Sequence, residues 1–120
     1  MKKKILIAED NAAVNKSLEL LLKPRYQIIP AMDGKQAVDM TVAQLPDLVL
    51  MDMVMPKING FQAARLIRQH PMTHSIPIIA LTALATSDEQ NECFQSGCNE
   101  FIAKPFKAED LIPRITKLLM

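Results

Sequence analysis

Five residues with reactive side chains follow short apolar runs at four points of the chain: Glu9, Asp10, Asp52, Thr82 and Lys104. Asp52 is the most unusual of them, because it follows the apolar run DLVL and lies among methionines in the stretch MDMVMP. If the three carboxylates came together they would repel, since two unit charges about 4 Å apart cost on the order of 4 kcal/mol at an effective dielectric of 20. A positive charge must then offset them.

A magnesium ion and a lysine would supply that positive charge. Mg²⁺ binds few protein oxygens, keeps several waters and takes up phosphate oxygens. Lys104 is suited to donate to phosphate as a point charge, and the Thr82 hydroxyl could bond another phosphoryl oxygen. An aspartate beside these groups is equipped to attack phosphorus and to carry the phosphoryl group as an acyl phosphate. Asp52 is the expected nucleophile.

Each of these residues has a simpler structural explanation when it is taken alone. Glu9 and Asp10 could cap a helix and interact with its N-terminal dipole. Thr82 could merely end a strand, and Lys104 could lie on the surface before Pro105. The functional hypothesis rests on their joint placement at the strand ends of one sheet, since motifs without structural context mislead.

The segments that must position these residues are of two alternating kinds. Apolar runs too short for helices predict five strands, and the segments between and after them carry apolar residues mostly at helical spacing. Runs without polar alternation indicate strands buried on both faces, and strands joined by helices must run parallel with right-handed crossovers. The predicted strands are residues 4–8, 26–29, 47–51, 77–81 and 101–103.

The predicted fold class is α/β: a (βα)5 doubly wound parallel five-stranded sheet, order 2-1-3-4-5, in a flavodoxin-like three-layer sandwich. Pro30 favours an edge position for the second strand, because proline cannot donate to a central ladder. In that order the first strand lies beside the third, and ligands bind at the carboxyl ends of the strands near the reversal of strand order.

Composition limits the class of protein. The 120 residues, 49% of them hydrophobic, suit one compact domain. A net charge of +1 provides no bulk positive field for direct nucleic-acid binding. No apolar run approaches the roughly 18 residues of a membrane span, and the opening run ILIA is too short for a signal peptide. A cytoplasmic protein without direct membrane or nucleic-acid partners is expected.

Four motifs together resemble the receiver domain of two-component response regulators. They are AEDN (8–11), LMDMVMPKING (50–60), ALTA (80–83) and FIAKPF (101–106), and they occur in the family's order. The resemblance spans residues 1–120, so one receiver domain is expected. A member of this family is a standard example of the 2-1-3-4-5 order, and the predicted order is therefore not independent of the resemblance.

The resemblance implies a phosphorylation switch. Asp52 would accept a phosphoryl group from a sensor histidine kinase or a histidine phosphotransfer protein. Mg²⁺, or Mn²⁺ in its place, would be held by Asp10, Asp52 and the main-chain carbonyl of Val54, with Glu9 acting through water. Lys104 would contact the phosphoryl group. The chain would assist its own phosphorylation and slow dephosphorylation without being an enzyme for a separate substrate.

The resemblance also implies how the signal would leave the site. Thr82 would move toward the phosphate and Phe101 would turn inward, changing the face formed by the fourth helix, fifth strand and fifth helix for a downstream effector protein. Such a switch shifts an existing equilibrium only through contacts that differ between its two states. The Lys104–Pro105 bond is expected to be cis, and Gly60 is expected to be structural.

The sequence departs from the common family pattern in three respects. Phe101 lacks the hydroxyl of the commoner tyrosine. Val54 and Leu84 are apolar where a polar side chain could orient water, which predicts slow self-dephosphorylation. The segment 86–96 has a capping-box pattern from Ser87 to Gln90, which predicts the start of a helix. Its apolar face is sparse, which predicts that this helix is loosely held.

Two other functions remain as alternatives. A haloacid-dehalogenase-like phosphohydrolase also uses an aspartate after a strand, but it needs a second aspartate two residues later, where this chain has Val54. A phosphorylation-independent interaction module usually lacks acidic, threonine or lysine positions that are all present here. If the chain ends at Met120, output must pass through a partner; the ALTALA and GCNEF segments are also similar to receivers attached to hybrid sensor kinases.

Overall fold

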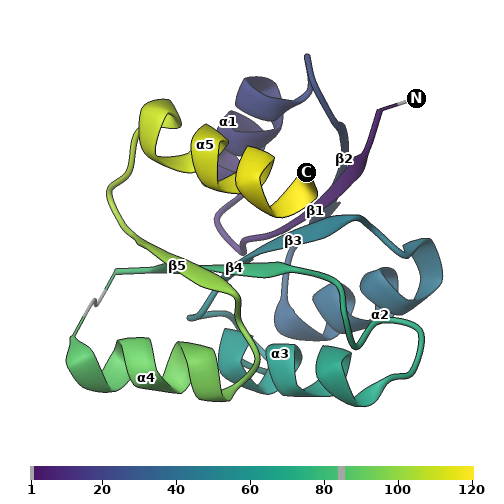
Figure 1. Cartoon of the computed structure of the whole chain (residues 1–120), viewed down its shortest axis with the longest axis vertical. Helices are drawn as coiled ribbons and strands as arrows, with labels where there is room; N and C mark the ends of the chain where they lie inside the picture. The colour runs from purple at the N-terminus through teal and green to yellow at the C-terminus, as the bar shows by residue number, and fades with distance from the viewer. Residues whose placement is uncertain (1, 84–85) are drawn as a thin grey trace.

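The computed structural model describes residues 2–83 and 86–120, which form a parallel sheet between two layers of helices (Figure 1). The strands are β1 (Lys4–Ala8), β2 (Gln27–Ala31), β3 (Leu48–Asp52), β4 (Ile78–Thr82) and β5 (Glu100–Ala103). The helices are α1 (Ala12–Leu22), α2 (Gly34–Gln44), α3 (Gly60–Gln69), α4 (Ser87–Gln95) and α5 (Ala108–Leu119). The sheet order is β2-β1-β3-β4-β5 and all neighbouring pairs are parallel, which confirms the predicted fold class.

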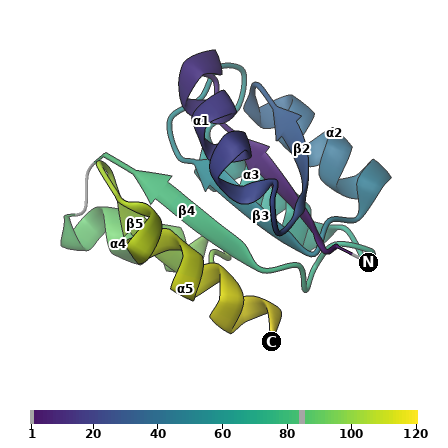
Figure 2. The same cartoon turned by 90° about the horizontal axis from the view of Figure 1, so that it is seen from above.

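The helices divide between the two faces of the sheet. Figures 1 and 2 show α1 and α5 on one face and α2, α3 and α4 on the other. Successive strand residues point to opposite faces, so Leu48 and Leu50 join the core under α1 and α5, whereas Val49 and Met51 join the core under the other helices. Burial on both faces explains why β3 reads as an uninterrupted apolar run.

β2 lies at the edge of the sheet and contains Pro30, as predicted. Pro30 pairs with Ile7 of β1, and the strand continues to Ala31, two residues beyond the predicted end. The boundary prediction was wrong because an edge strand can accommodate proline without losing a ladder bond to a second neighbour.

Within the described residues, no helix is both long and apolar enough to cross a bilayer.

α4 begins one residue earlier than its predicted capping pattern. Thr86, not Ser87, is the N-cap, and its side chain accepts a hydrogen bond from the backbone N–H of Glu89 at 3.2 Å. The prediction was wrong because Thr86-x-x-Glu89 fits the same capping pattern as Ser87-x-x-Gln90, and only the extended backbone of Thr86 distinguishes them. Cys93 is the one buried residue of α4, and Phe94 is 49% exposed. That α4 is loosely held stays a prediction.

Gly60 allows α3 to start directly against the end of β3. Its backbone N–H donates to the carbonyl oxygen of Met53 at 3.0 Å. A Cβ on Gly60 would lie 2.6 Å from the carbonyl oxygen of Asp52 and 2.7 Å from the Cα of Met53. The absence of a side chain therefore fixes how closely α3 approaches the end of β3.

The substitution Gly60→Ala should destabilise the fold by about 2–3 kcal/mol, because the methyl group would overlap backbone atoms that cannot rotate away. Urea unfolding monitored by circular dichroism measures this change. Ala12→Ser, at the exposed first position of α1, is the control and should change stability by less than about 0.5 kcal/mol. Equal stabilities of Gly60→Ala and the wild type would contradict the prediction.

Candidate functional site

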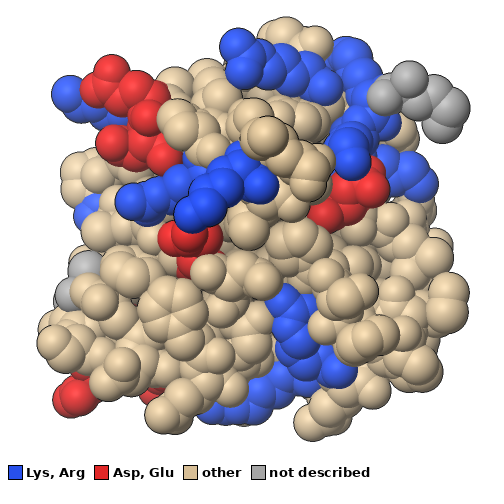
Figure 3. All heavy atoms as spheres, in the orientation of Figure 1, with Lys and Arg blue, Asp and Glu red and all other residues tan. Residues whose placement is uncertain are grey.

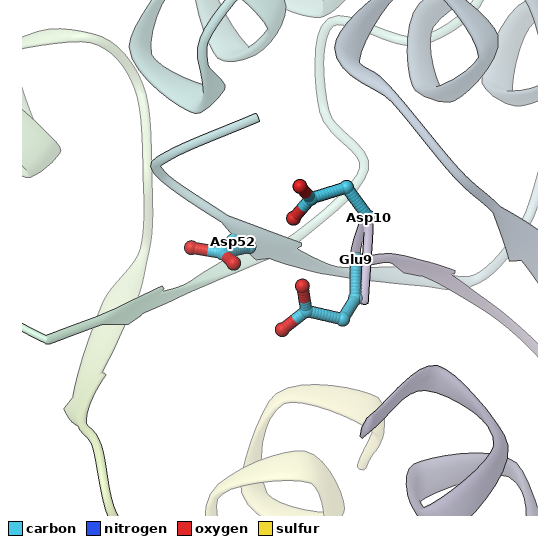
Figure 4. Close-up of side chains that lie close together, drawn as sticks. All are labelled: Glu9, Asp10 and Asp52. Carbon is cyan, nitrogen blue, oxygen red and sulfur yellow. The ribbon is translucent and has the colours of Figure 1, made fainter. Parts of the chain in front are cut away.

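The ends of β1 and β3 bring Glu9, Asp10 and Asp52 together (Figure 4). β1 and β3 are neighbours with Ala8 paired to Met51, so the residues that follow these two emerge at the same edge of the sheet. One oxygen atom from each of the three carboxylates lies within 4.8 Å of the others. The three acids therefore share one site.

The three acids differ in their exposure to solvent. Glu9 is 2% exposed and Asp52 is 7% exposed, whereas Asp10 is exposed. Burial raises the pKa of Glu9 above its ordinary value of 4.5, although hydrogen bonds from Lys104 and the Asn11 amide oppose this change. Ionised Glu9 therefore costs folding free energy, which a nearby cation would reduce.

Lys104 is the cation that the fold places against these acids. Its Nζ atom lies 2.8 Å from Oε1 of Glu9 and 3.0 Å from Oδ2 of Asp52. Burial alone would lower the pKa of Lys104, but the hydrogen bonds and charges of the two carboxylates outweigh it and hold the pKa above its ordinary value. The peptide bond from Lys104 to Pro105 is cis, as expected. Lys104 thus bridges two acids from different strands.

Asn15 is a site residue that the sequence analysis missed. It is buried, and its amide nitrogen donates to the carbonyl oxygens of Ile7, Glu9 and Ala31 at 3.1–3.2 Å. These bonds tie α1 to the backbone at the end of β1, where Glu9 begins. The sequence did contain a signal for this role, because Asn15 is a polar residue on the same helical face as the buried Leu18 and Leu22.

Thr82 ends β4 beside this group and is 2% exposed. Its Oγ1 donates a hydrogen bond to Oε1 of Glu89, on the first turn of α4, at 2.9 Å. Its carbonyl oxygen accepts from the backbone N–H of Lys104 at 2.7 Å. No pattern in the sequence pointed to Glu89, because its contact with Thr82 depends on how α4 packs.

Phe101 lies on β5 and is partly buried. Its ring meets that of Phe94 from α4 edge to face, with ring centroids 5.9 Å apart and planes at 78°. This arrangement is favourable for aromatic rings beyond their burial. α4 therefore contacts both residues that the sequence assigns to switching, Thr82 through Glu89 and Phe101 through Phe94.

The side chain of Val54 points largely into solvent, with 73% of the residue exposed. Its backbone N–H donates to Oδ1 of Asp52 at 3.1 Å. Val54 therefore lies next to Asp52 and offers no polar side-chain atom there. Leu84, the second apolar position noted in the sequence, lies outside the described residues.

The donor set fits a magnesium ion. Carboxylate oxygens are the ligands that Mg²⁺ prefers, and the ion commonly uses one or two of them and completes its shell with water. Glu9, Asp10 and Asp52 supply only oxygen donors, and the exposure of Asp10 leaves one side of the group open to water. The buried acids also need positive charge beyond what one lysine provides.

Comparison with known proteins agrees with this architecture. The family "Response regulator receiver domain" matches residues 5–116. The chain is 32% identical over 115 residues to "Hybrid signal transduction histidine kinase D" of Dictyostelium discoideum, covering 96% of this chain and 7% of that protein. It is 34% identical over 119 residues to "Response regulator PleD" of Caulobacter vibrioides, covering 98% of this chain and 26% of that protein.

A solved structure extends the similarity to three dimensions. It is the receiver domain of sensor histidine kinase PA1611 from Pseudomonas aeruginosa PAO1, with a magnesium ion coordinated in its active site cleft. The TM-score is 0.92 at 35% identity, and the match covers 99% of this chain and 98% of that one.

The fold, the acidic site and the family match define a signalling domain. The chain belongs to the response regulator receiver domain family of two-component systems. It spans about half or less of the length of the curated relatives it matches.

Removing the Lys104 charge should strengthen magnesium binding. In Lys104→Met the cation that competes for the oxygens of Glu9 and Asp52 is gone, and the apolar stem remains. We expect an affinity about tenfold higher, measured by isothermal titration calorimetry at low ionic strength. Lys107→Met removes the same charge from an exposed position in the same loop and should leave the affinity within about twofold. Unchanged or weaker binding by Lys104→Met would contradict the prediction.

The raised pKa of Glu9 predicts a pH-dependent effect of Glu9→Gln on stability. Because the folded-state pKa lies above 4.5, ionisation of Glu9 destabilises the fold; this cost is absent below the unfolded pKa and complete above the folded pKa. Without divalent ions, Glu9→Gln should therefore gain stability relative to the wild type as pH rises through that window. Urea unfolding at about pH 4 and about pH 8 measures the difference.

Glu109→Gln is the control for this measurement, because the side chain of Glu109 is 75% exposed. It should show no comparable gain with pH. A constant stability difference between Glu9→Gln and the wild type across the pH range would show that Glu9 does not titrate as described.

Proposed function

We propose that residues 1–120 form one receiver domain that is switched by phosphorylation of Asp52. The observation that carries the proposal is the placement of the buried Asp52 carboxylate, 3.0 Å from Lys104 and beside two further acids, in a chain of this family. The sensor histidine kinase or histidine phosphotransfer protein that donates the group is the upstream partner.

The transfer conserves atoms and charge in a simple way. An oxygen of the Asp52 carboxylate attacks the phosphorus atom of a phosphohistidine, the P–O bond forms, and the P–N bond breaks with its electron pair returning to the imidazole. Lys104 moves from the carboxylates to the phosphoryl oxygens, since its Nζ already lies at hydrogen-bond distance from Asp52. The protein is thus a phosphoacceptor and not an enzyme acting on a separate substrate.

Magnesium is the cofactor that this site is suited to hold, and Mn²⁺ offers similar chemistry. Asp10, Asp52 and the main-chain carbonyl of Val54 would bind it directly, and Glu9 would act through water. When bound, the ion offsets the charge of the carboxylates and of the incoming phosphoryl oxygens.

The signal would leave through α4, β5 and α5. Thr82 and Phe101 contact α4 through Glu89 and Phe94, so a change at either residue alters how α4 is held. In Figure 3 the surface over β5 and α4 is mostly uncharged, which suits a protein partner. The domain would thus signal by binding a downstream effector protein, and it would not itself bind nucleic acid or a membrane.

An apolar groove next to Lys104 is a candidate surface for the phosphodonor. Its volume is about 690 Å³, and it is lined on one side by Val14, Leu18 and Leu21 of α1 and on the other by Pro105 and Phe106. A donor bound there would bring its histidine near Asp52 from the open side of the site.

The proposed phosphoryl transfer takes place in the cytoplasm.

The phosphohydrolase alternative is disfavoured by the position of Val54. Its exposed apolar side chain provides no second acid beside Asp52 to protonate a leaving group. An interaction module that works without phosphorylation is the other alternative, and it would not be modified at Asp52.

Intact-mass measurement after incubation with acetyl phosphate and Mg²⁺ tests the proposal. The wild type should gain the mass of one phosphoryl group, and Asp52→Asn should gain none because an amide is not a nucleophile for this transfer. Asp39→Asn, at an exposed position on α2, is the control and should be modified like the wild type. No gain by the wild type, or an equal gain by Asp52→Asn, would refute the proposal.

The apolar neighbour of the acceptor predicts a long-lived phosphorylated state. In Val54→Asn an amide would be available to orient a water molecule toward the acyl phosphate, so loss of the phosphoryl group should be about tenfold faster. The decay of the phosphorylated mass species after donor removal measures this rate. Val42→Asn, which introduces the same amide on α2, is the control. Equal decay of Val54→Asn and the wild type would count against the explanation.

A further inference from the structure

The hydroxyl of Thr82 is already engaged in this structure. Oγ1 of Thr82 donates to Oε1 of Glu89 at 2.9 Å, and this bond joins the buried end of β4 to the partly buried Glu89 on the first turn of α4. Glu89 is itself held in place, because its backbone N–H donates to the side chain of the N-cap Thr86. A hydrogen bond to a carboxylate is stronger than one between neutral groups.

A threonine hydroxyl carries one hydrogen and can donate one such bond at a time. Donation to a phosphoryl oxygen on Asp52 and donation to Glu89 are therefore mutually exclusive. We propose that Glu89 is a positioning residue that restrains Thr82 in the unphosphorylated state and so weakens the response to phosphorylation. The inference rests on the proposed function, since it concerns the same site.

The restraint also links the site to α4. When Thr82 leaves Glu89, α4 loses a contact with β4. Among the described residues of α4, Cys93 alone is buried, so few other contacts compensate. The edge-to-face contact of Phe94 with Phe101 is the second connection between α4 and the switch residues. Loss of the first contact therefore leaves the contact between Phe94 and Phe101 to hold α4 against the switch residues.

A second effect of Glu89 must be separated from this restraint. Its carboxylate would repel a phosphoryl group simply through its charge. Asp88 stands in the same first turn of α4 and is exposed, so Asp88→Ala removes an equal charge from nearly the same place. Thr82→Val removes the hydroxyl and leaves the charge of Glu89 in place.

The test measures the binding of beryllofluoride, a noncovalent phosphoryl mimic, in the presence of Mg²⁺ by isothermal titration calorimetry. Glu89→Ala should bind about 3- to 10-fold more tightly than the wild type, and Glu89→Gln, which keeps a neutral acceptor and the side-chain shape, should show a smaller gain. Asp88→Ala should change affinity by less than about twofold. In a Thr82→Val background, Glu89→Ala should have no effect.

The possible outcomes distinguish a failure of this inference from a failure of the proposed phosphorylation of Asp52. A wild type that binds no beryllofluoride contradicts the proposed function, and the inference falls with it. If the wild type binds but Glu89→Ala and Glu89→Gln bind no more tightly, the inference alone is wrong. An equal gain from Asp88→Ala, or an undiminished gain in the Thr82→Val background, shows that Glu89 acts through charge and overturns its positioning role.

Discussion

The repulsion among clustered carboxylates is the constraint on which this structure depends. Glu9 and Asp52 are nearly buried, and Asp10 stands beside them, so the fold must bring positive charge to the same place. Lys104 does so from the loop between β5 and α5, at 2.8 Å from Glu9 and 3.0 Å from Asp52. Because one lysine cannot neutralise three acids, a further cation would stabilise the site, and this is the physical basis of the proposed magnesium binding.

The strand order explains why the site lies where it does. β1 lies between β2 and β3, and the connections after β1 and β3 lead to helices on opposite faces of the sheet, so the strand order reverses at this point (Figure 2). The backbone at these two strand ends is fixed by specific contacts. Asn15 ties α1 to the end of β1, and Gly60 lets α3 press against the end of β3. The acids are thus held by elements that have few alternative positions.

α4 is held differently from the other helices, and this difference suits a switch. Cys93 is its one buried residue, and Glu89 and Phe94 connect it to β4 and β5. This small buried apolar area is the basis of the prediction that α4 is loosely held. Glu89 contacts Thr82 and Phe94 contacts Phe101. A change of Thr82 at the acidic site would therefore directly alter a contact that holds α4 in position.

The sequence determined the layers and the reactive residues of this protein. Uninterrupted apolar runs such as LVLM (48–51) favour burial on both faces, and the helices between them require parallel pairing, so the ends of β1, β3, β4 and β5 meet at one edge. Tertiary structure alone decided which atoms touch. The bonds of Asn15, the bridge of Lys104 and the contact of Thr82 with Glu89 depend on angles and distances between elements, whereas sequence spacing reports only the period within one element.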